Sequence, residues 1–177
     1  MKNNRNGQAE VLTDEQLDQL LAVMQPNHWL LFSICYYTSC RVSEALKLKR
    51  SDIIGDRIVF RACTTKTKMT RDVKIPAKLS VILSQADFPT VGYLFPGKCG
   101  GHLTRQAADL ALRKACDYIG LKGVSTHSFR RTGLTKLYKM GVPLKTLQER
   151  TGHADLGNLS QYLAIGKEEV DAIAELL

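Results

Sequence analysis

The chain has 177 residues, of which 44% are hydrophobic and 24% are charged. This is the size of one ordinary domain, long enough to bury a core without disulfides or metals. Lys and Arg together number 25 and Asp and Glu 17, so the formal charge is +8. A basic globular chain favours a polyanionic partner, either nucleic acid or an anionic membrane. No apolar run approaches the roughly 20 residues that a spanning helix needs, which disfavours a membrane protein.

The first ten residues are polar and lack the apolar core of a secretory signal, so we predict a cytoplasmic protein. We interpret residues 1–10 as a disordered lead or linker remnant, and residues 11–177 as one domain. The five cysteines form no Cys-x-x-Cys pair, and their odd number favours reduced thiols. Cys99 and His102 are spaced like half of a zinc site, but no second half follows, so we assign no metal.

Helical periodicity dominates the first part of the chain. A Thr-x-x-Gln capping box opens a helix over residues 13–24. Residues 27–39 are apolar on most sides, which is typical of a buried helix. A further short helix is expected to begin near Val42 and to carry Leu46 and Leu48.

The period changes in the middle of the chain. Residues 57–63 and 72–75 are rich in β-formers, and the stretch between them is polar and basic, which predicts a β-hairpin with a basic tip. Further helices are expected after Pro76 and over residues 104–120, 128–140, 143–150, 157–164 and 168–177. The predicted fold class is mostly α with a small antiparallel β-sheet (α+β).

Short segments along the chain carry side chains suited to phosphate chemistry. In Thr38-Ser39-Cys40-Arg41-Val42-Ser43-Glu44, the glutamate follows the arginine by three residues and can hold its guanidinium in place. Lys66 and Lys68 lie at the predicted hairpin tip. Alone, the first feature is a common surface ion pair, and the second is a common aid to solubility.

Three more segments lie in the C-terminal third. His127 and Arg130 share one face of a predicted helix. Gly152 ends a helix and leaves His153 on a bend, and Tyr162 follows nine residues later on a short helix, where a lone tyrosine is usually a packing residue. Together the segments supply two arginines for phosphate charge, proton donors and a nucleophile, as metal-free phosphoryl transfer requires.

In their order and spacing these segments resemble the catalytic domain of the tyrosine recombinase (phage integrase) family, a DNA breaking-rejoining fold. They span nearly the whole chain. Two positions depart from the family: Ser39 stands where glycine is usual, and Arg131 where histidine is frequent. The chain starts at the entry to the catalytic domain, so we expect the family's amino-terminal core-binding domain to lie outside it.

The resemblance implies a site-specific recombinase or integrase of a mobile element that acts on double-stranded DNA. Tyr162 would attack the scissile phosphate and form a 3′-phosphotyrosyl link, without ATP, metal or other cofactor. Arg41 and Arg130 would bind the non-bridging oxygens, since planar guanidinium forks suit phosphate. Glu44 would support Arg41.

The resemblance also assigns proton transfers. Lys66 would protonate the leaving 5′-oxygen, with Lys68 as the alternative because the turn is long. His127 would serve as general base or proton relay, and His153 would hydrogen-bond the phosphate. The C-terminal segment 168–177 carries an apolar stripe that either packs on its own domain or, as in the family, docks into a neighbouring protomer of a homotetramer on DNA.

Three other functions compete with this interpretation. A type IB topoisomerase shares the chemistry but reseals a single duplex. A DNA-binding regulator keeps the fold without cutting and has no need of Tyr162. A helix-turn-helix repressor over residues 128–152 leaves Arg41, the hairpin and Tyr162 unexplained.

Overall fold

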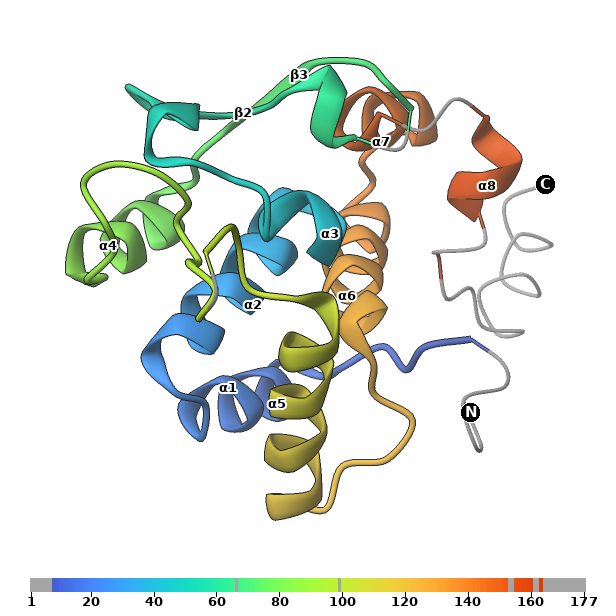
Figure 1. The fold of residues 1–177 in the computed structure, drawn as a ribbon. Coiled ribbons are helices and arrows are strands. Elements are labelled where there is room, and N and C mark those ends of the chain that lie inside the picture. The colour runs from blue at the N-terminus through green and yellow to red at the C-terminus, as the bar shows by residue number, and fades with distance from the viewer. Residues whose placement is uncertain (1–7, 66, 99, 153–154, 161–162, 164–177) are drawn as a thin grey trace, which may run out of the picture.

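The computed structural model describes residues 8–65, 67–98, 100–152, 155–160 and 163. It confirms the predicted mixture of many helices with one small antiparallel sheet (Figure 1). The helices are α1 (Asp14–Ala22), α2 (Pro26–Thr38), α3 (Val42–Ala45), α4 (Ala77–Gln85), α5 (Arg105–Tyr118), α6 (Thr126–Lys139), α7 (Leu144–Thr151) and α8 (Leu156–Ser160). The strands are β1 (Ile53–Ile54), β2 (Arg57–Phe60) and β3 (Arg71–Lys74), and short 3-10 turns cover Arg50–Asp52 and Ala62–Thr64.

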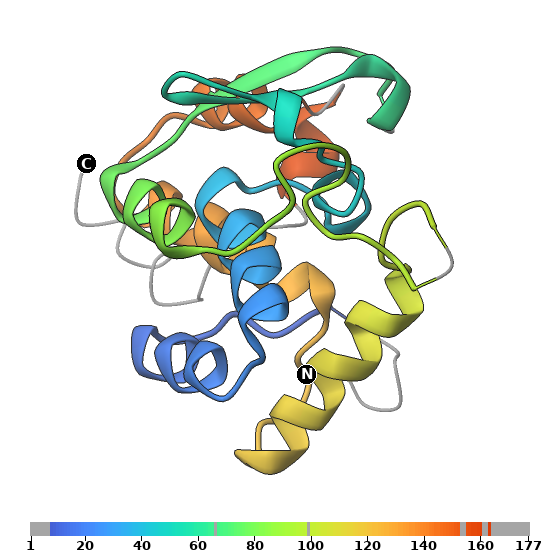
Figure 2. The same cartoon turned by 60° about the vertical axis from the view of Figure 1, so that its left-hand side comes forward.

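Helix α2 is the centre of the helical part, because α1, α3, α4, α5 and α6 all pack against it (Figure 2). Every side chain from Leu30 to Cys35 is buried, more than a full helical turn, as the pattern of residues 27–39 predicts. Phe32 of α2 stacks on Phe129 of α6, with ring centroids 4.5 Å apart. The burial of α2 therefore fixes α6 beside it, and α6 carries two of the predicted site residues.

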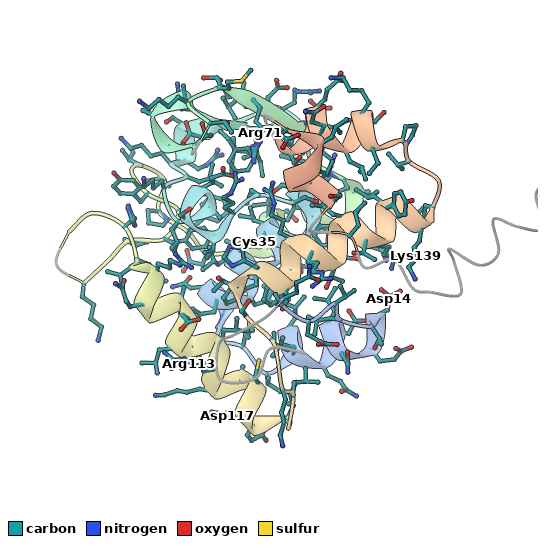
Figure 3. The ribbon with its side chains drawn as sticks, turned by 90° about the vertical axis from the view of Figure 1, so that its right-hand side faces the viewer. Asp14, Cys35, Arg71, Arg113, Asp117 and Lys139 are labelled. Atoms are coloured by element: carbon teal, nitrogen blue, oxygen red, sulfur yellow. The ribbon has the colours of Figure 1, made fainter. Side chains whose placement is uncertain are left out.

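The sheet lies across one end of the molecule, over α3 and beside α7 (Figures 1 and 2). Its strand order is β1-β2-β3, with both pairs antiparallel, and Phe60 of β2 pairs with Arg71 of β3. Figure 3 shows Arg71 at this end, whereas Arg113 and Asp117 of α5 lie at the opposite end.

The predicted hairpin is present, but its first strand is shorter than the expected 57–63, and its second strand begins at Arg71, one residue before the expected 72–75. β2 ends at Phe60 because the following residues turn into a 3-10 helix. Threonine hydroxyls then organise the tip: Thr65 Oγ1 donates to the Met69 carbonyl at 3.0 Å, and Thr70 Oγ1 accepts from the Ala62 N–H at 3.0 Å. Strand β1 has only two residues, too few for a periodic signal in the sequence.

Several helix boundaries differ from the sequence prediction by one or two residues, and the end of α3 differs by more. α3 ends at Ala45, so Leu46 and Leu48 lie beyond it, although both are buried. The chain leaves the helix there because the Leu48 carbonyl accepts the Leu94 N–H at 2.9 Å, a contact from far along the sequence. α8 is described over Leu156–Ser160, and residues 161–162 and 164–177, which include the predicted helix over 168–177, lie outside the described part of the chain.

The described end of the N-terminal lead is held against α6. The Ala9 carbonyl accepts from Arg131 Nη1 at 2.7 Å, and the Leu12 N–H donates to Thr132 Oγ1 at 2.9 Å. Arg131, one of the two departures from the family pattern, thus ties the entry segment to the helix that carries Arg130. Residues 1–7 lie outside the described residues.

Four cysteines fall within the described residues, and all four carry free thiols: Cys35, Cys40, Cys63 and Cys116. Burial raises the pKa of Cys116 to about 11, so this thiol stays protonated at neutral pH. Among the described side chains, no three of His, Cys, Asp or Glu gather as a metal site. None of the helices in these ranges has the length and apolar character needed to cross a membrane.

Ser39, the other departure from the family pattern, ends α2 in the left-handed conformation, with φ 53° and ψ 30°. This region costs an L-residue with a Cβ roughly 1–2 kcal/mol, whereas glycine adopts it freely. Ser39 is fully buried, and its hydroxyl has no hydrogen-bond partner among the described residues. Serine therefore carries both a backbone and a desolvation cost at a position where glycine would carry neither.

We predict that Ser39→Gly raises the free energy of unfolding by about 1 kcal/mol, because it removes both costs. Ser39→Ala is the matched control, since it removes only the hydroxyl and should gain less. Denaturant titration of the three proteins measures both differences. A glycine variant no more stable than the alanine variant would contradict the prediction.

We predict that Gly133→Ala destabilises the domain by about 1–3 kcal/mol through overpacking. A Cβ at this position of α6 would lie 2.6 Å from the Tyr36 carbonyl oxygen of α2, and backbone cannot yield as a flexible side chain does. Without such a clash, replacing glycine by alanine inside a helix stabilises the helix by about 1 kcal/mol. A lower thermal midpoint of the variant would therefore confirm the close approach of α6 to α2. A higher midpoint would contradict it.

Candidate active site

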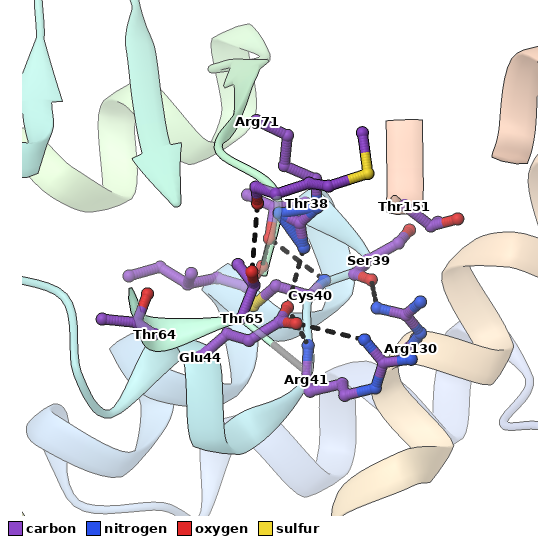
Figure 4. A network of polar contacts seen from close by, with 12 residues as sticks. Thr38, Ser39, Cys40, Arg41, Glu44, Thr64, Thr65, Arg71, Arg130 and Thr151 are labelled. Carbon is purple, nitrogen blue, oxygen red and sulfur yellow. Dashed lines mark hydrogen bonds and ion pairs between the residues drawn. The ribbon is translucent and has the colours of Figure 1, made fainter. Parts of the chain in front are cut away.

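Four arginines from four different elements gather where α2 ends and α3 begins. Arg41 precedes α3, Arg71 opens β3, Arg130 lies on α6 and Arg150 lies on α7. Figure 4 shows three of them, Arg41, Arg71 and Arg130, around the turn that joins α2 to α3. The turn therefore collects positive charge from segments that are far apart in the sequence.

Glu44 is the carboxylate inside this cluster, and only 2% of its side chain is exposed. Its Oε1 accepts from Arg41 Nη1 at 3.1 Å, and its Oε2 accepts from the Arg41 backbone N–H at 3.0 Å. Oε2 also accepts from Arg71 Nη2 at 2.7 Å. The contact expected from the three-residue spacing of Arg41 and Glu44 is thus present, because the third residue of a helix can reach back to the residue that precedes the helix.

Arg130 brings α6 to the same turn. Its side chain is almost completely buried, and Nη1 donates to the carbonyl oxygen of Ser39, 91 residues away in the sequence. Ser39 lies two residues before Arg41, so the two predicted phosphate ligands flank one short turn. His127 lies three residues before Arg130, in the first turn of α6, and is half-buried.

Arg150 binds the last turn of α2, where its Nη2 donates to the Tyr37 carbonyl at 2.6 Å. Burial, together with the positive charge of Arg71, lowers the pKa of the Arg150 guanidinium. The carbonyl end of a helix carries partial negative charge, so it stabilises a guanidinium there. Sequence reasoning did not single out Arg71 or Arg150, because neither stands in a spacing pattern with another chemical group.

The hairpin tip packs against the end of α7. Gly152 ends α7 in the left-handed conformation, with φ 65°, as predicted. A Cβ there would lie 3.1 Å from Arg71 Cδ and 3.9 Å from Thr67 Oγ1. Thr67 follows Lys66 in the sequence and Gly152 precedes His153, so residues adjacent to two predicted site residues meet here.

The structure describes five of the eight predicted site residues. Arg41, Glu44 and Arg130 come together at one turn, and His127 lies on the same helix as Arg130. Lys68 is exposed in the hairpin turn, with φ 52°. The remaining three lie outside the described residues: Lys66, His153 and Tyr162.

We predict that Glu44→Gln lowers the free energy of unfolding by about 2–4 kcal/mol, because it leaves two guanidiniums without their buried carboxylate. Asp56→Asn is a matched control: Asp56 pairs with Lys74 at 3.8 Å, and both side chains are more than half exposed. Exposed pairs contribute about 0–1 kcal/mol. Equal effects of the two substitutions in denaturant titrations would show that Glu44 is not the buried centre of the cluster.

Residues 10–169 match the sequence model described as the Phage integrase family. A provisionally named integrase/recombinase, y4qK of Sinorhizobium fredii, is 33% identical over 169 residues, covering 92% of this chain and 54% of its own length. Tyrosine recombinase XerC of Nitrobacter winogradskyi is 30% identical, covering 79% of this chain and 46% of its own. The chain thus spans about half the length of these relatives.

Solved structures share the fold. The catalytic domain of bacteriophage HP1 integrase superimposes with a TM-score of 0.70 at 24% identity, covering 95% of both chains. The XerA recombinase superimposes with a TM-score of 0.77 at 19% identity, covering 98% of this chain and 65% of the other. The family match extends over nearly all of the sequence and includes the arginine turn, so the chain belongs to the phage integrase family.

Proposed function

We propose that this chain is the catalytic domain of a site-specific DNA recombinase, which cleaves and rejoins double-stranded DNA through a 3′-phosphotyrosyl link to Tyr162. The observation that carries the proposal is the convergence of Arg41 and Arg130 on one turn of a chain in this family. Structural neighbours include the XerH recombinase bound to its difH substrate and the Tn1549 integrase in complex with DNA, which supports DNA as the partner.

The arginine pair suits the charge that develops during cleavage. A phenol has a free pKa near roughly 10, so neutral Tyr162 needs a base and nearby positive charge to attack phosphorus. Planar guanidinium forks match the two non-bridging oxygens better than the point charge of a lysine does. Donors fixed before the reaction strengthen as the oxygens gain charge, and each such contact contributes a few kcal/mol to the transition state.

The proposed cleavage step forms one bond to phosphorus, breaks another and moves two protons. The Tyr162 oxygen forms a bond to phosphorus as its proton passes to His127, and the bond from phosphorus to the 5′-oxygen breaks. Lys66 gives that oxygen a proton, with Lys68 as the alternative donor, while His153 hydrogen-bonds the phosphate. Attack by a 5′-hydroxyl of another duplex reverses the step, so the phosphodiester energy is conserved and the proposed reaction needs neither ATP nor a metal.

The same proposal extends to the assembly of the protein on DNA, its biological role and its location. The apolar stripe of residues 168–177 would dock into a neighbouring protomer and so assemble a homotetramer on DNA. The mobile-element role is supported by the integrase names of the relatives and by the transposon integrase among the structural neighbours. A DNA substrate also fits the cytoplasmic location expected from the sequence.

A covalent-trapping experiment tests the nucleophile. The protein is incubated with nicked duplexes tiled across its own genomic locus and then separated under denaturing conditions. We expect a protease-sensitive protein–DNA adduct that Tyr162→Phe abolishes and Arg130→Lys strongly reduces. Tyr118→Phe is the matched control, because Tyr118 is 81% exposed at the end of α5 and should leave the adduct unchanged.

The outcomes separate the competing functions. Salt-sensitive DNA binding without an adduct would favour the non-cleaving regulator. An adduct that reseals only its own duplex, without strand exchange between two duplexes, would favour the topoisomerase. An adduct that survives Tyr162→Phe would refute the assignment of the nucleophile.

A further inference from the structure

Arg71 has no role in the reaction proposed above, yet the structure places it inside the arginine cluster. Only 10% of its side chain is exposed, although it opens the strand that follows the basic hairpin tip, where a solvated side chain is expected. Its guanidinium carbon lies 4.2 Å from the centroid of the Phe60 ring. Burying a guanidinium is costly unless it is paired, so the position of Arg71 requires a specific partner.

That partner is Glu44, at 2.7 Å from Arg71 Nη2. Glu44 Oε2 is held from two directions, by Arg71 and by the Arg41 backbone N–H at 3.0 Å. With Oε2 held in this way, the planar carboxylate can rotate little, and Oε1 stays directed at the Arg41 guanidinium, 3.1 Å away. The orientation of the Arg41 side chain therefore depends on Arg71 through Glu44 (Figure 4).

Arg71 also connects the hairpin to α7. Its Cδ lies 3.1 Å from the position that a Cβ on Gly152 would occupy, so its aliphatic stem fills the space above the helix end. The same side chain thus contacts a strand residue, a buried carboxylate of α3 and the last turn of α7. No exposed arginine of the sheet makes such contacts among the described residues: Arg57 pairs only with Asp72, and both are about half exposed.

We propose that Arg71 is a positioning residue for the cleavage reaction: by fixing Glu44 it sets the direction of the Arg41 guanidinium, and it ties the hairpin that carries Lys66 to the end of α7. The inference rests on the proposed function, because it assigns Arg41 to the scissile phosphate. It predicts that Arg71 acts on the rate of cleavage rather than on the affinity for DNA.

The first test compares Arg71→Met with Arg57→Met, which removes an exposed arginine from the same pair of strands. We expect Arg71→Met to slow adduct formation at saturating DNA by about 10- to 100-fold, the effect of losing one charge-assisted hydrogen bond. DNA affinity should change by less than about 3-fold. Arg57→Met should alter neither quantity.

Arg71→Lys serves as the conservative variant and as the second measurement should the methionine variant fold poorly. Lysine keeps the charge but cannot reproduce the fork, so we expect a cleavage rate between those of the wild type and Arg71→Met. Combining Arg71→Met with Arg41→Lys should cost less than the product of the single effects, because both act through one guanidinium. Independent, multiplicative effects in this cycle would overturn the inference.

A readout without DNA distinguishes failure of this inference from failure of the proposed function. In nitrogen-15 spectra of the protein, the guanidinium signals of Arg41 should broaden or exchange faster in Arg71→Met and stay unchanged in Arg57→Met. Unchanged Arg41 signals and an unchanged cleavage rate in Arg71→Met would overturn the positioning role. If the wild type forms no adduct but the Arg41 signals respond as expected, the positioning contact stands and the proposed reaction fails.

Discussion

The buried carboxylate of Glu44 is the constraint on which the arrangement of the site depends. A carboxylate removed from water costs several kcal/mol unless charges and hydrogen bonds compensate it. Here the compensation comes from a backbone N–H at the start of α3, from Arg41 and from Arg71. Because these groups belong to α3 and β3, satisfying one charge fixes the sheet against the helical part of the molecule.

The end of α2 supplies the second half of the arrangement. The carbonyl groups of its last turn and of the left-handed residue Ser39 would lack partners, as at any helix end. Arg150 binds the Tyr37 carbonyl and Arg130 binds that of Ser39, so α6 and α7 are drawn to the same turn. The arginines therefore stabilise the fold at the place where they also gather positive charge, and the central position of α2 makes their convergence possible.

Sequence patterns predicted the elements better than their contacts. The capping box before α1, the apolar pattern of α2 and the glycine that ends α7 are local signals, and each is present as expected. The spacing of Arg41 and Glu44 is also local, so their contact could be predicted. Arg71 and Arg150 could not be found in this way, because their partners lie 27 and 113 residues away. The two-residue strand β1 and the early end of α3 depend on similarly distant pairings.

An arginine can anchor the fold and bind a phosphate because of its shape. A guanidinium carries five N–H donors in one plane, and the contact with Glu44 uses only one nitrogen of the Arg41 side chain. Anchoring that nitrogen restricts the rotation of the whole planar group. The guanidinium therefore loses its conformational entropy on folding and not in the reaction. Electrostatic catalysis depends on such prior fixation, because donors that must reorganise as charge develops contribute less. The stability of the buried cluster and its suitability for phosphate chemistry thus arise from the same contacts.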